Sequence, residues 1–336
     1  MLAPMAELSH RPLRELIEHF GGCDEYFTEM ISAGALIGNG PFESFYTDNG
    51  PCPGKLVYQL VGADPGQLAA AAALLDRLDC KGIDINMGCS APAITRTGAG
   101  VRWMADPDRA AAMIAQVRAI THRRLSVKLR IGMEDNFDYL VTFCRRLESE
   151  GVELITLHPR TGREKFKRRA RWEYVDALHA ALGIPVAGNG DIAGTEDLVR
   201  RAASGCCDAA TYDGVMVGRA AVRAPWIFAA AKKVTGAILA CPQANDAASS
   251  MDGVDDIDLE EVGLRFLDLL AKYQPPEFHI SRARRFFNYF CDNLKWGTYV
   301  KNLLNRETAL GGIAKTWPAY FREHPEDRET KAPALF

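Results

Sequence analysis

The chain has 336 residues, which is long enough for one large domain and a smaller one. Hydrophobic residues make up 48% and charged residues 25%, so a disordered or fibrous protein is excluded. The formal net charge of −3 excludes a uniformly basic nucleic-acid binder but is compatible with a local basic surface.

The nine cysteines are scattered and form neither a CxxC pair nor a cluster with histidine. We therefore expect no metal site and no disulfide framework. The N-terminal segment lacks a basic region followed by an apolar one, and no apolar run reaches membrane-spanning length. These features predict a soluble, cytoplasmic protein without a membrane partner, and we expect a monomer.

Short apolar runs alternate with helical patterns over about the first 230 residues. The predicted strands span residues 2–6, 27–32, 56–61, 82–86, 126–130, 154–158, 185–188 and 214–217. The predicted helices include residues 65–78, 107–120, 136–150, 172–182 and 195–203. Eight strand–helix units are typical of a (β/α)₈ TIM barrel, an α/β fold of about 250 residues. A doubly wound sheet is the alternative, but its usual GxGxxG turn is absent.

The rest of the chain differs in composition. Residues 236–258 are rich in small and acidic residues and predict a linker. Apolar residues then recur at helical spacing over residues 259–273, a further helix is predicted over residues 281–305, and a polar tail follows Trp317. We therefore predict a barrel of residues 1–235, the linker, and a small all-helical domain of residues 259–336.

Residues suited to ligand contact follow the predicted strands. Because the carboxyl ends of barrel strands meet at one mouth, such residues would line one pocket although they are far apart in the chain. Each could instead be structural, since a lone lysine or histidine is commonly a paired core residue. The candidates are Ala3, Pro4, Met5, Gln59, Asn86, Cys89, Lys128, Arg130, His158, Asn189, Gly190, Asp191, Gly218 and Arg219.

The turns after the last two strands are the most diagnostic. Residues 188–191 read Gly-Asn-Gly-Asp, and Gly218-Arg219 follows the last strand. Their backbone N–H groups could surround a phosphate, at the usual phosphate position of TIM barrels, although ordinary turn chemistry is the alternative. A planar cofactor with a phosphate, such as FMN, would place its ring near Gln59 and Lys128 and its tail in these turns.

The run Asp84-Ile-Asn-Met-Gly-Cys-Ser90 ends a strand of buried character in a glycine and a cysteine. A thiol at this edge can act as an acid toward a bound substrate, or it can be a small buried hydrophobe. A free thiol is mostly protonated near neutral pH, as an acid catalyst must be. The other polar strand ends favour the catalytic interpretation of Cys89.

Several motifs resemble the tRNA-dihydrouridine synthase family, in the order in which that family has them. They are Ala3-Pro-Met5, Gln59-Leu-Val-Gly62, Asp84-Ile-Asn-Met-Gly-Cys89, Lys128-Leu-Arg130, Leu157-His-Pro-Arg-Thr161, Gly188-Asn-Gly-Asp191 and Gly218-Arg219. The match covers about residues 1–230, and the helical end is similar to the family's C-terminal tRNA-binding domain. The cysteine motif, followed by Gly98-Ala-Gly100 and Asp106-Pro107, is the most specific, whereas many FMN barrels share the glycine turns.

The resemblance implies an FMN enzyme that is reduced by NADPH and passes a hydride to C6 of a uracil in tRNA. Cys89 would then donate a proton to C5. The resemblance also implies flavin contacts for Gln59, Lys128 and His158, and phosphate contacts for Asn189, Gly190, Gly218 and Arg219. The remaining implied cofactor residues are Ala3, Pro4, Met5 and Asp191, and Asn86 would face the uracil or the isoalloxazine.

Two positions depart from the family pattern. The family usually has proline directly after the cysteine and lysine three residues after it, whereas this chain has Ser90 and Pro92. This loop would cover the substrate, so the modified position and the preferred tRNA context stay open.

Two basic tracts are suited to an RNA backbone. The first follows His158 and contains one acid, Glu164, among Arg160, Arg163, Lys165, Lys167, Arg168, Arg169 and Arg171. The second is interleaved with aromatic residues and contains Arg282, Arg284, Arg285, Lys295, Lys301 and Arg306. A solvated face is the alternative for each tract. We predict that the tRNA is bound by Asn86, Arg130, Arg160, Arg168, Arg169, Arg282 and Arg285.

Two other functions stay open from the sequence. An FMN barrel reductase of a small molecule, similar to dihydroorotate dehydrogenase or an ene-reductase, would explain the phosphate turns and the thiol. It would not explain the basic tracts or the helical domain. A catalytically idle tRNA-binding paralogue would have no need of Cys89, Lys128 and His158 together.

Overall fold

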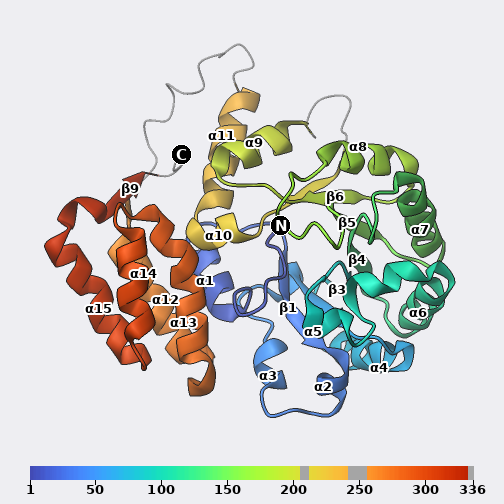
Figure 1. Ribbon diagram of the computed structural model, residues 1–336, viewed down its shortest axis with the longest axis horizontal. Coiled ribbons are helices and arrows are strands. Elements are labelled where there is room, and N and C mark those ends of the chain that lie inside the picture. Colours follow the sequence, from blue (N-terminus) through green and yellow to red (C-terminus); the bar gives the residue numbers. More distant parts are fainter. Residues whose placement is uncertain (205–211, 241–255, 332–336) are drawn as a thin grey trace. The chain divides into compact units, whose positions relative to one another are not determined.

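The computed structural model describes residues 1–204, 212–240 and 256–331. The chain forms two compact units (Figure 1). Unit 1 comprises Met1–Met5, Glu25–Asp191 and Ser204–Met216, and unit 2 comprises Ala6–Asp24, Ile192–Ala203 and Val217–Phe336. Because the units alternate along the chain, their limits differ from the predicted domain boundaries at 235 and 258, which stay a prediction.

Unit 1 is built on one parallel sheet in which strands neighbour one another in chain order. Its strands are β1 (Tyr26–Ser32), β2 (Leu56–Val61), β3 (Gly82–Met87), β4 (Arg124–Arg130), β5 (Leu154–His158), β6 (Val186–Asn189) and β7 (Gly214–Met216). Every residue of β2, β3 and β5 is buried, as expected for a parallel sheet covered on both faces. These strands confirm seven of the eight that the sequence predicts.

The N-terminal segment joins the two edges of this sheet. The main-chain nitrogen of Met1 donates to the carbonyl of Val215 in β7 at 2.9 Å, and Leu2 forms a parallel bridge with β1. The strand predicted over residues 2–6 is therefore wrong in extent, because Pro4 has no N–H group with which to continue a ladder. The eighth barrel position is still occupied, and the predicted α/β TIM barrel with C-terminal helices is confirmed.

The longer helices of unit 1 lie around the outside of the sheet (Figure 1). Three of them begin at an Asp or Asn whose side-chain oxygen accepts a hydrogen bond from the backbone N–H three residues further along the chain. These capping residues are Asp64, Asp106 and Asn136, with N···O distances of 2.8, 3.0 and 2.9 Å. Because the capping residues can be recognised in the sequence, the predicted starts of these three helices lie within one residue of the observed ones. The helices are α2 (Ala33–Ile37), α3 (Glu43–Tyr46), α4 (Pro65–Asp76), α5 (Pro92–Thr95), α6 (Pro107–Ile120), α7 (Phe137–Ser149) and α8 (Trp172–Ala181).

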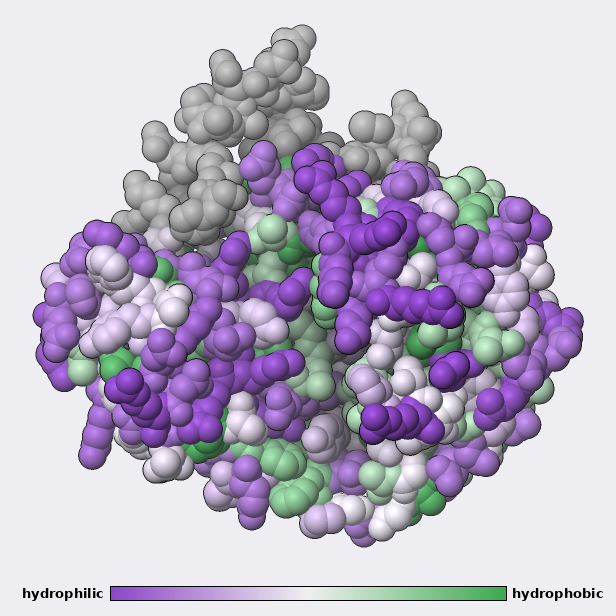
Figure 2. Space-filling model, viewed as in Figure 1, coloured by the Kyte–Doolittle hydropathy of each residue, from purple (hydrophilic) through white to green (hydrophobic). Residues whose placement is uncertain are grey.

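Unit 2 is helical, and its described residues include one small antiparallel sheet of β8 (Asp256–Asp258) and β9 (Glu329–Lys331), with four long helices between the two strands in the chain. Its helices are α1 (Arg11–His19), α9 (Thr195–Ser204), α10 (Arg219–Arg223), α11 (Ile227–Ala240), α12 (Leu259–Tyr273), α13 (Pro276–Phe290), α14 (Gly297–Arg306) and α15 (Leu310–Glu323). Helices α12 to α15 pack side by side, α1 contacts α12, and α10 contacts α13 (Figure 1). The visible face of α12 to α15 is largely hydrophilic (Figure 2).

Aromatic rings fill the core of unit 2. The rings of Phe266 and Phe286 stack with centroids 3.7 Å apart. Trp317 is fully buried, and its Nε1 donates to the carbonyl of Glu260 at 3.0 Å. A Cβ at Gly263 would lie 2.3 Å from this nitrogen, so only glycine lets α12 approach the tryptophan ring.

Three predictions for this part of the chain need correction or lie outside the described residues. The helix predicted over residues 281–305 is interrupted between α13 and α14, where Gly297 packs against the Cys291 carbonyl. The tail after Trp317 is not wholly polar, because α15 continues and buries Tyr320 and Phe321. The predicted linker falls mainly on residues 241–255, outside the described residues, and α11 occupies its first residues.

Replacing Trp317 by alanine should lower the free energy of unfolding by about 3–5 kcal/mol, because it removes a buried ring from a packed core. Trp296 provides a matched control, since its side chain is 49% exposed. Its replacement should change stability by less than about 0.5 kcal/mol. Urea unfolding of both variants tests this, and similar losses would contradict the packing described for α12 and α15.

Candidate functional site

Strand register brings the predicted site residues of unit 1 to one edge of the sheet. Gln59 pairs with Asp84, Asn86 pairs with Lys128, and Arg130 pairs with His158 on successive strands. Since all these strands are parallel, these side chains stand at or near the same rim. Cys89 follows the end of β3 by two residues.

A buried hydrogen-bond network connects three of the strands. Asp84 is fully buried and accepts from Ser126 Oγ and from Gln59 Nε2, both at 2.7 Å. Gln59 Oε1 in turn accepts from Asn86 Nδ2 at 2.9 Å. Burial raises the pKa of Asp84 to about 6, and the two donated hydrogen bonds oppose the shift.

Asn86 holds the turn that carries the thiol. Its Oδ1 accepts from the backbone N–H groups of Gly88 at 3.2 Å and Cys89 at 2.9 Å. The Cys89 carbonyl accepts from Val101 at 3.0 Å. A Cβ at Gly100, whose φ is +63°, would lie 2.4 Å from the same carbonyl oxygen, so the turn is closely packed. Cys89 itself is half-buried, which keeps it within reach of a ligand.

Two cations lie beside this turn. Lys128 is partly buried, and burial together with Arg130 lowers its pKa to about 8, while Asp84 and Cys89 act in the opposite direction. Arg130 is buried and donates to the carbonyls of Gly88 at 3.0 Å and Thr161 at 3.1 Å. It thereby joins the thiol turn to the loop after β5.

Lys128 and Arg130 bring positive charge to the mouth of the barrel. Among the described residues, no carboxylate forms an ion pair with Lys128 or Arg130, so both cations can face an electron-rich group. Gly190 has a φ of +129°, and a Cβ there would lie 3.1 Å from Ala170 and 3.2 Å from His158. Glycine at this position therefore lets the turn after β6 pack closely against Ala170 and His158.

His158, Arg160 and Asp191 are bound to one another. Arg160 is buried, with Nη1 at 2.9 Å from His158 Nε2 and Nη2 at 2.5 Å from Asp191 Oδ1. Asp191 also accepts from the Ala170 N–H at 2.6 Å. The predicted substrate role of Arg160 and cofactor role of Asp191 stay predictions, and this geometry favours a structural pairing for both.

The remaining predicted cofactor residues are divided between the units. Asn189 Nδ2 donates to the Met216 carbonyl at 2.8 Å, at the end of β6. Ala3 is buried with Phe27 and Val57, and Met5 packs against that cluster while Pro4 is partly buried. Gly218 and Arg219 follow β7 directly but belong to unit 2.

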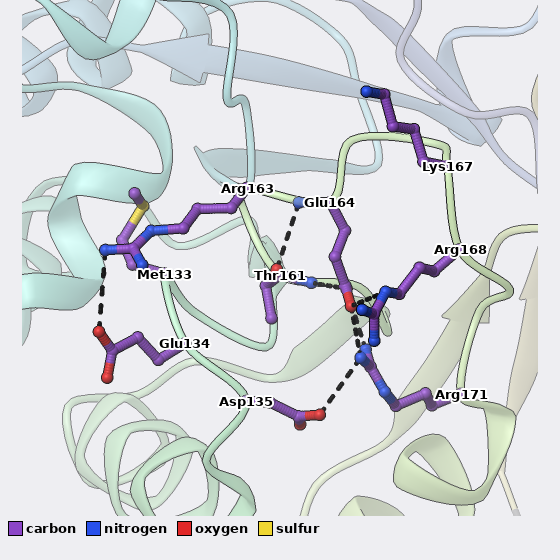
Figure 3. A pocket seen from close by; sticks show the side chains of 9 residues that line it. All are labelled: Met133, Glu134, Asp135, Thr161, Arg163, Glu164, Lys167, Arg168 and Arg171. Carbon is purple, nitrogen blue, oxygen red and sulfur yellow. Dashed lines mark hydrogen bonds and ion pairs between the residues drawn. The ribbon is translucent and has the colours of Figure 1, made fainter.

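A pocket of about 500 Å³ lies between the loops that follow β4 and β5 (Figure 3). At its centre the side chains of Glu164, Arg168 and Arg171 converge, while Lys167 points away from them (Figure 3). Arg171 donates to both Glu164 oxygens, at 2.5 and 3.0 Å, and lowers the pKa of that carboxyl to about 2. The sequence did not point to the other wall, which Met133, Glu134 and Asp135 form.

The basic tracts differ in exposure from residue to residue. In the first tract, Arg168 and Arg169 are exposed, and Arg168 lies 3.8 Å from Glu164. In the second, Arg285 is exposed, whereas Arg282 is only 2% exposed and lies over the ring of Phe278. The substrate role of Arg282 stays a prediction, and its burial favours a structural role.

The two departures from the family motif lie on the thiol loop. Ser90 is partly buried, and Pro92 is exposed at the first position of α5. The part of the chain that the structure describes contains no group of three metal-ligating side chains. Within the same residues, no helix is both long and apolar enough to cross a membrane.

Comparison with known proteins identifies the chain's relatives. A family model described as "Dihydrouridine synthase (Dus)" matches residues 1–254. A protein of Aquifex aeolicus named "Probable tRNA-dihydrouridine synthase" is 33% identical over 233 residues, 68% of this chain and 71% of that protein. A "tRNA-dihydrouridine(16) synthase" of Cupriavidus necator is 32% identical over 238 residues, 67% of this chain and 71% of that protein.

Replacing Asp84 by asparagine should make the protein more stable near neutral pH. The pKa of Asp84 is raised from 3.8 to about 6, so the folded protein binds this proton more tightly than the unfolded chain. The buried charge therefore costs stability above about pH 6, on the order of 3 kcal/mol, and the cost vanishes as the pH falls toward 4. Urea unfolding of both proteins should show the difference shrinking between pH 6 and 4. A difference that is independent of pH would contradict this titration.

Proposed function

The chain belongs to the dihydrouridine synthase family, and we propose that it reduces uridines in tRNA to 5,6-dihydrouridine. We further propose FMN as its redox cofactor and NADPH as the reductant. The observation that carries the proposal is the half-buried thiol of Cys89, held at the mouth of the barrel beside Lys128 and Arg130. The matched relatives are named for the same reaction.

The residues at the mouth fit FMN. Gln59, Lys128 and His158 would contact the ring, with Lys128 supplying positive charge to its polar edge. Asn189, Gly190, Gly218 and Arg219 would hold the phosphate, helped by the glycine backbone. When bound, FMN supplies the hydride for C6 of the uracil.

Cys89 would complete the reduction by donating its proton to C5 of the uracil. One hydride at C6 and one proton at C5 together saturate the C5–C6 double bond. The thiol is held for this task by the Asn86 side chain, which fixes the backbone of Gly88 and Cys89 at 3.2 and 2.9 Å. Positioning of a general acid contributes directly to the rate.

The exposed cations would bind the RNA backbone. Arg168 and Arg169 stand on the loop after β5, the strand that ends in His158. In unit 2, the exposed Arg285 is the corresponding candidate, and residues 259–336 would form the tRNA-binding part. A uridine in an exposed loop of the RNA can leave its stack and enter the mouth.

Replacing Cys89 by alanine should abolish most uridine reduction while leaving FMN and tRNA affinity within about threefold of the unchanged protein, because general-acid catalysis contributes about 10²–10⁴-fold. Flavin release on denaturation reports FMN binding, and filter binding reports tRNA affinity. Dihydrouridine mapping and tRNA-dependent reoxidation of the NADPH-reduced protein report uridine reduction. Cys52 is also half-buried, and Cys52→Ala serves as the matched control.

The outcomes of this experiment separate the possible functions. A flavin that reoxidises at a rate independent of tRNA would indicate a reductase of small molecules. A protein that binds tRNA but no flavin would indicate an idle binder. Unchanged turnover in Cys89→Ala would assign the proton donor to another group.

Replacing Arg168 and Arg169 together by alanine should weaken tRNA binding and flatten its dependence on salt. Each lost phosphate contact reduces the slope of log K against log [salt] by about 0.7–0.9. Arg145 and Arg146 are a neighbouring exposed pair on α7 and provide the control. Filter binding at several salt concentrations measures both slopes, and equal slopes would show that the loop arginines are only solvated.

A further inference from the structure

We propose that Asp84 is a positioning residue for Cys89, acting through the side-chain amides of Gln59 and Asn86. The carboxylate is joined to the thiol turn by a continuous chain of hydrogen bonds of 2.7, 2.9 and 2.9 Å. This inference rests on the proposed function only for the role of Cys89 in turnover. The positioning itself is a property of the protein without ligands.

The direction of every hydrogen bond in this chain is determined from its ends. The backbone N–H groups of Gly88 and Cys89 can only donate, so Asn86 must turn its oxygen toward them and its NH₂ group toward Gln59. Gln59 must then turn its oxygen toward Asn86 and its NH₂ group toward the next partner. That partner has to accept, and the carboxylate of Asp84 always does so.

Without an acceptor at position 84, only the backbone N–H groups of Gly88 and Cys89 favour this orientation of the amides. The NH₂ group of Gln59 would be buried without a partner, which costs about 1–3 kcal/mol, and rotation of the amide would relieve that cost. A rotated Gln59 would present a donor to the NH₂ group of Asn86, and two donors cannot bond. Asn86 would then hold the thiol turn without support from Gln59, and its hydrogen bonds to Gly88 and Cys89 would open more often.

Stability alone gives little reason for a carboxylate at this position. Asp84 is fully buried, and the described residues place no cation within ion-pair distance of it. Its hydrogen-bond donors, Ser126 and Gln59, are neutral side chains. Lys128 and Arg124 form no ion pair with it and offset only part of the cost of burying the charge. A hydrogen-bond acceptor kept at this cost in a strand next to the candidate site agrees with a role in function, and Asp84→Asn tests whether the oxygen or the charge is required.

Three variants separate the acceptor at position 84 from other properties of the residue. Asp84→Leu keeps the branched shape of the side chain, with two methyl groups in place of the oxygens, and removes the acceptor. Asp84→Asn keeps an oxygen for Gln59, because its NH₂ group can face the Ser126 hydroxyl. Ser126→Ala removes the donor on the other oxygen of Asp84 and leaves the amide chain intact.

Two measurements on the protein as purified, without substrate, report the position of the turn. One is the amide hydrogen-exchange rate of Gly88 and Cys89, and the other is the rate at which iodoacetamide alkylates Cys89, with Cys52 as the internal reference. Asp84→Leu should accelerate the exchange about five- to tenfold, the size expected for one lost hydrogen bond. Asp84→Asn and Ser126→Ala should stay within about threefold.

Uridine reduction should follow the same order. Asp84→Leu should lower kcat about 10²-fold, since a small misplacement of a catalytic group has that effect, and Asp84→Asn should recover most of it.

Wild-type exchange and alkylation rates in Asp84→Leu would overturn the proposal, as would equal changes in Asp84→Asn and Asp84→Leu. If circular dichroism shows Asp84→Leu to be unfolded, Gln59→Met breaks the same chain and carries the same expectation. Absence of uridine reduction in every protein would refute the proposed function, while the exchange rates would still decide the positioning role.

Discussion

Parallel pairing of successive strands is the constraint on which the rest of this structure depends. Because β1 to β7 run in one direction and in chain order, each strand delivers its last residues to the same rim. Residues separated by more than a hundred positions, such as Gln59 and Asn189, thereby lie on strands whose carboxyl ends form one edge. The strand register alone is enough to bring these residues to the rim. The same register brings the short motif of residues 84–89 to the rim that Lys128 and His158 share.

The site is arranged in layers of decreasing burial. Deepest are the fully buried Asp84 and Gln59, followed by Asn86 and then by the half-buried thiol of Cys89. Outside these lies a loop rich in arginine, in which some cations are already paired. Glu164 and Asp191 neutralise Arg171 and Arg160 from within the protein. The charge left for a polyanion is therefore carried by the exposed members of the tract, and it is smaller than a count of basic residues implies.

Patterns that depend on neighbouring residues could be predicted from the sequence, and those that depend on distant contacts could not. The limits of β2, β5, α6 and α12 agree with the prediction because apolar runs and capping residues mark them. The burial of Arg160 and Arg282 was not predictable, because the residue type alone does not distinguish an arginine bound inside the protein from one exposed to solvent. The hydrogen-bond network of Asp84 was also not predictable, because its members come from three different strands. The extent of the first strand was predicted wrongly for a local reason, because Pro4 has no N–H group with which to continue the ladder.

The way unit 2 is assembled has a consequence for how the protein is made. Helix α1 contacts α12, although the whole of the barrel sheet is encoded between them. During synthesis α1 leaves the ribosome long before its partner exists, and its buried residues Leu13, Leu16 and Ile17 stay without their final neighbours until then. A growing chain therefore has to protect the apolar face of α1 while the barrel strands are still being added. Shortening the chain from its C-terminus would make that temporary exposure permanent.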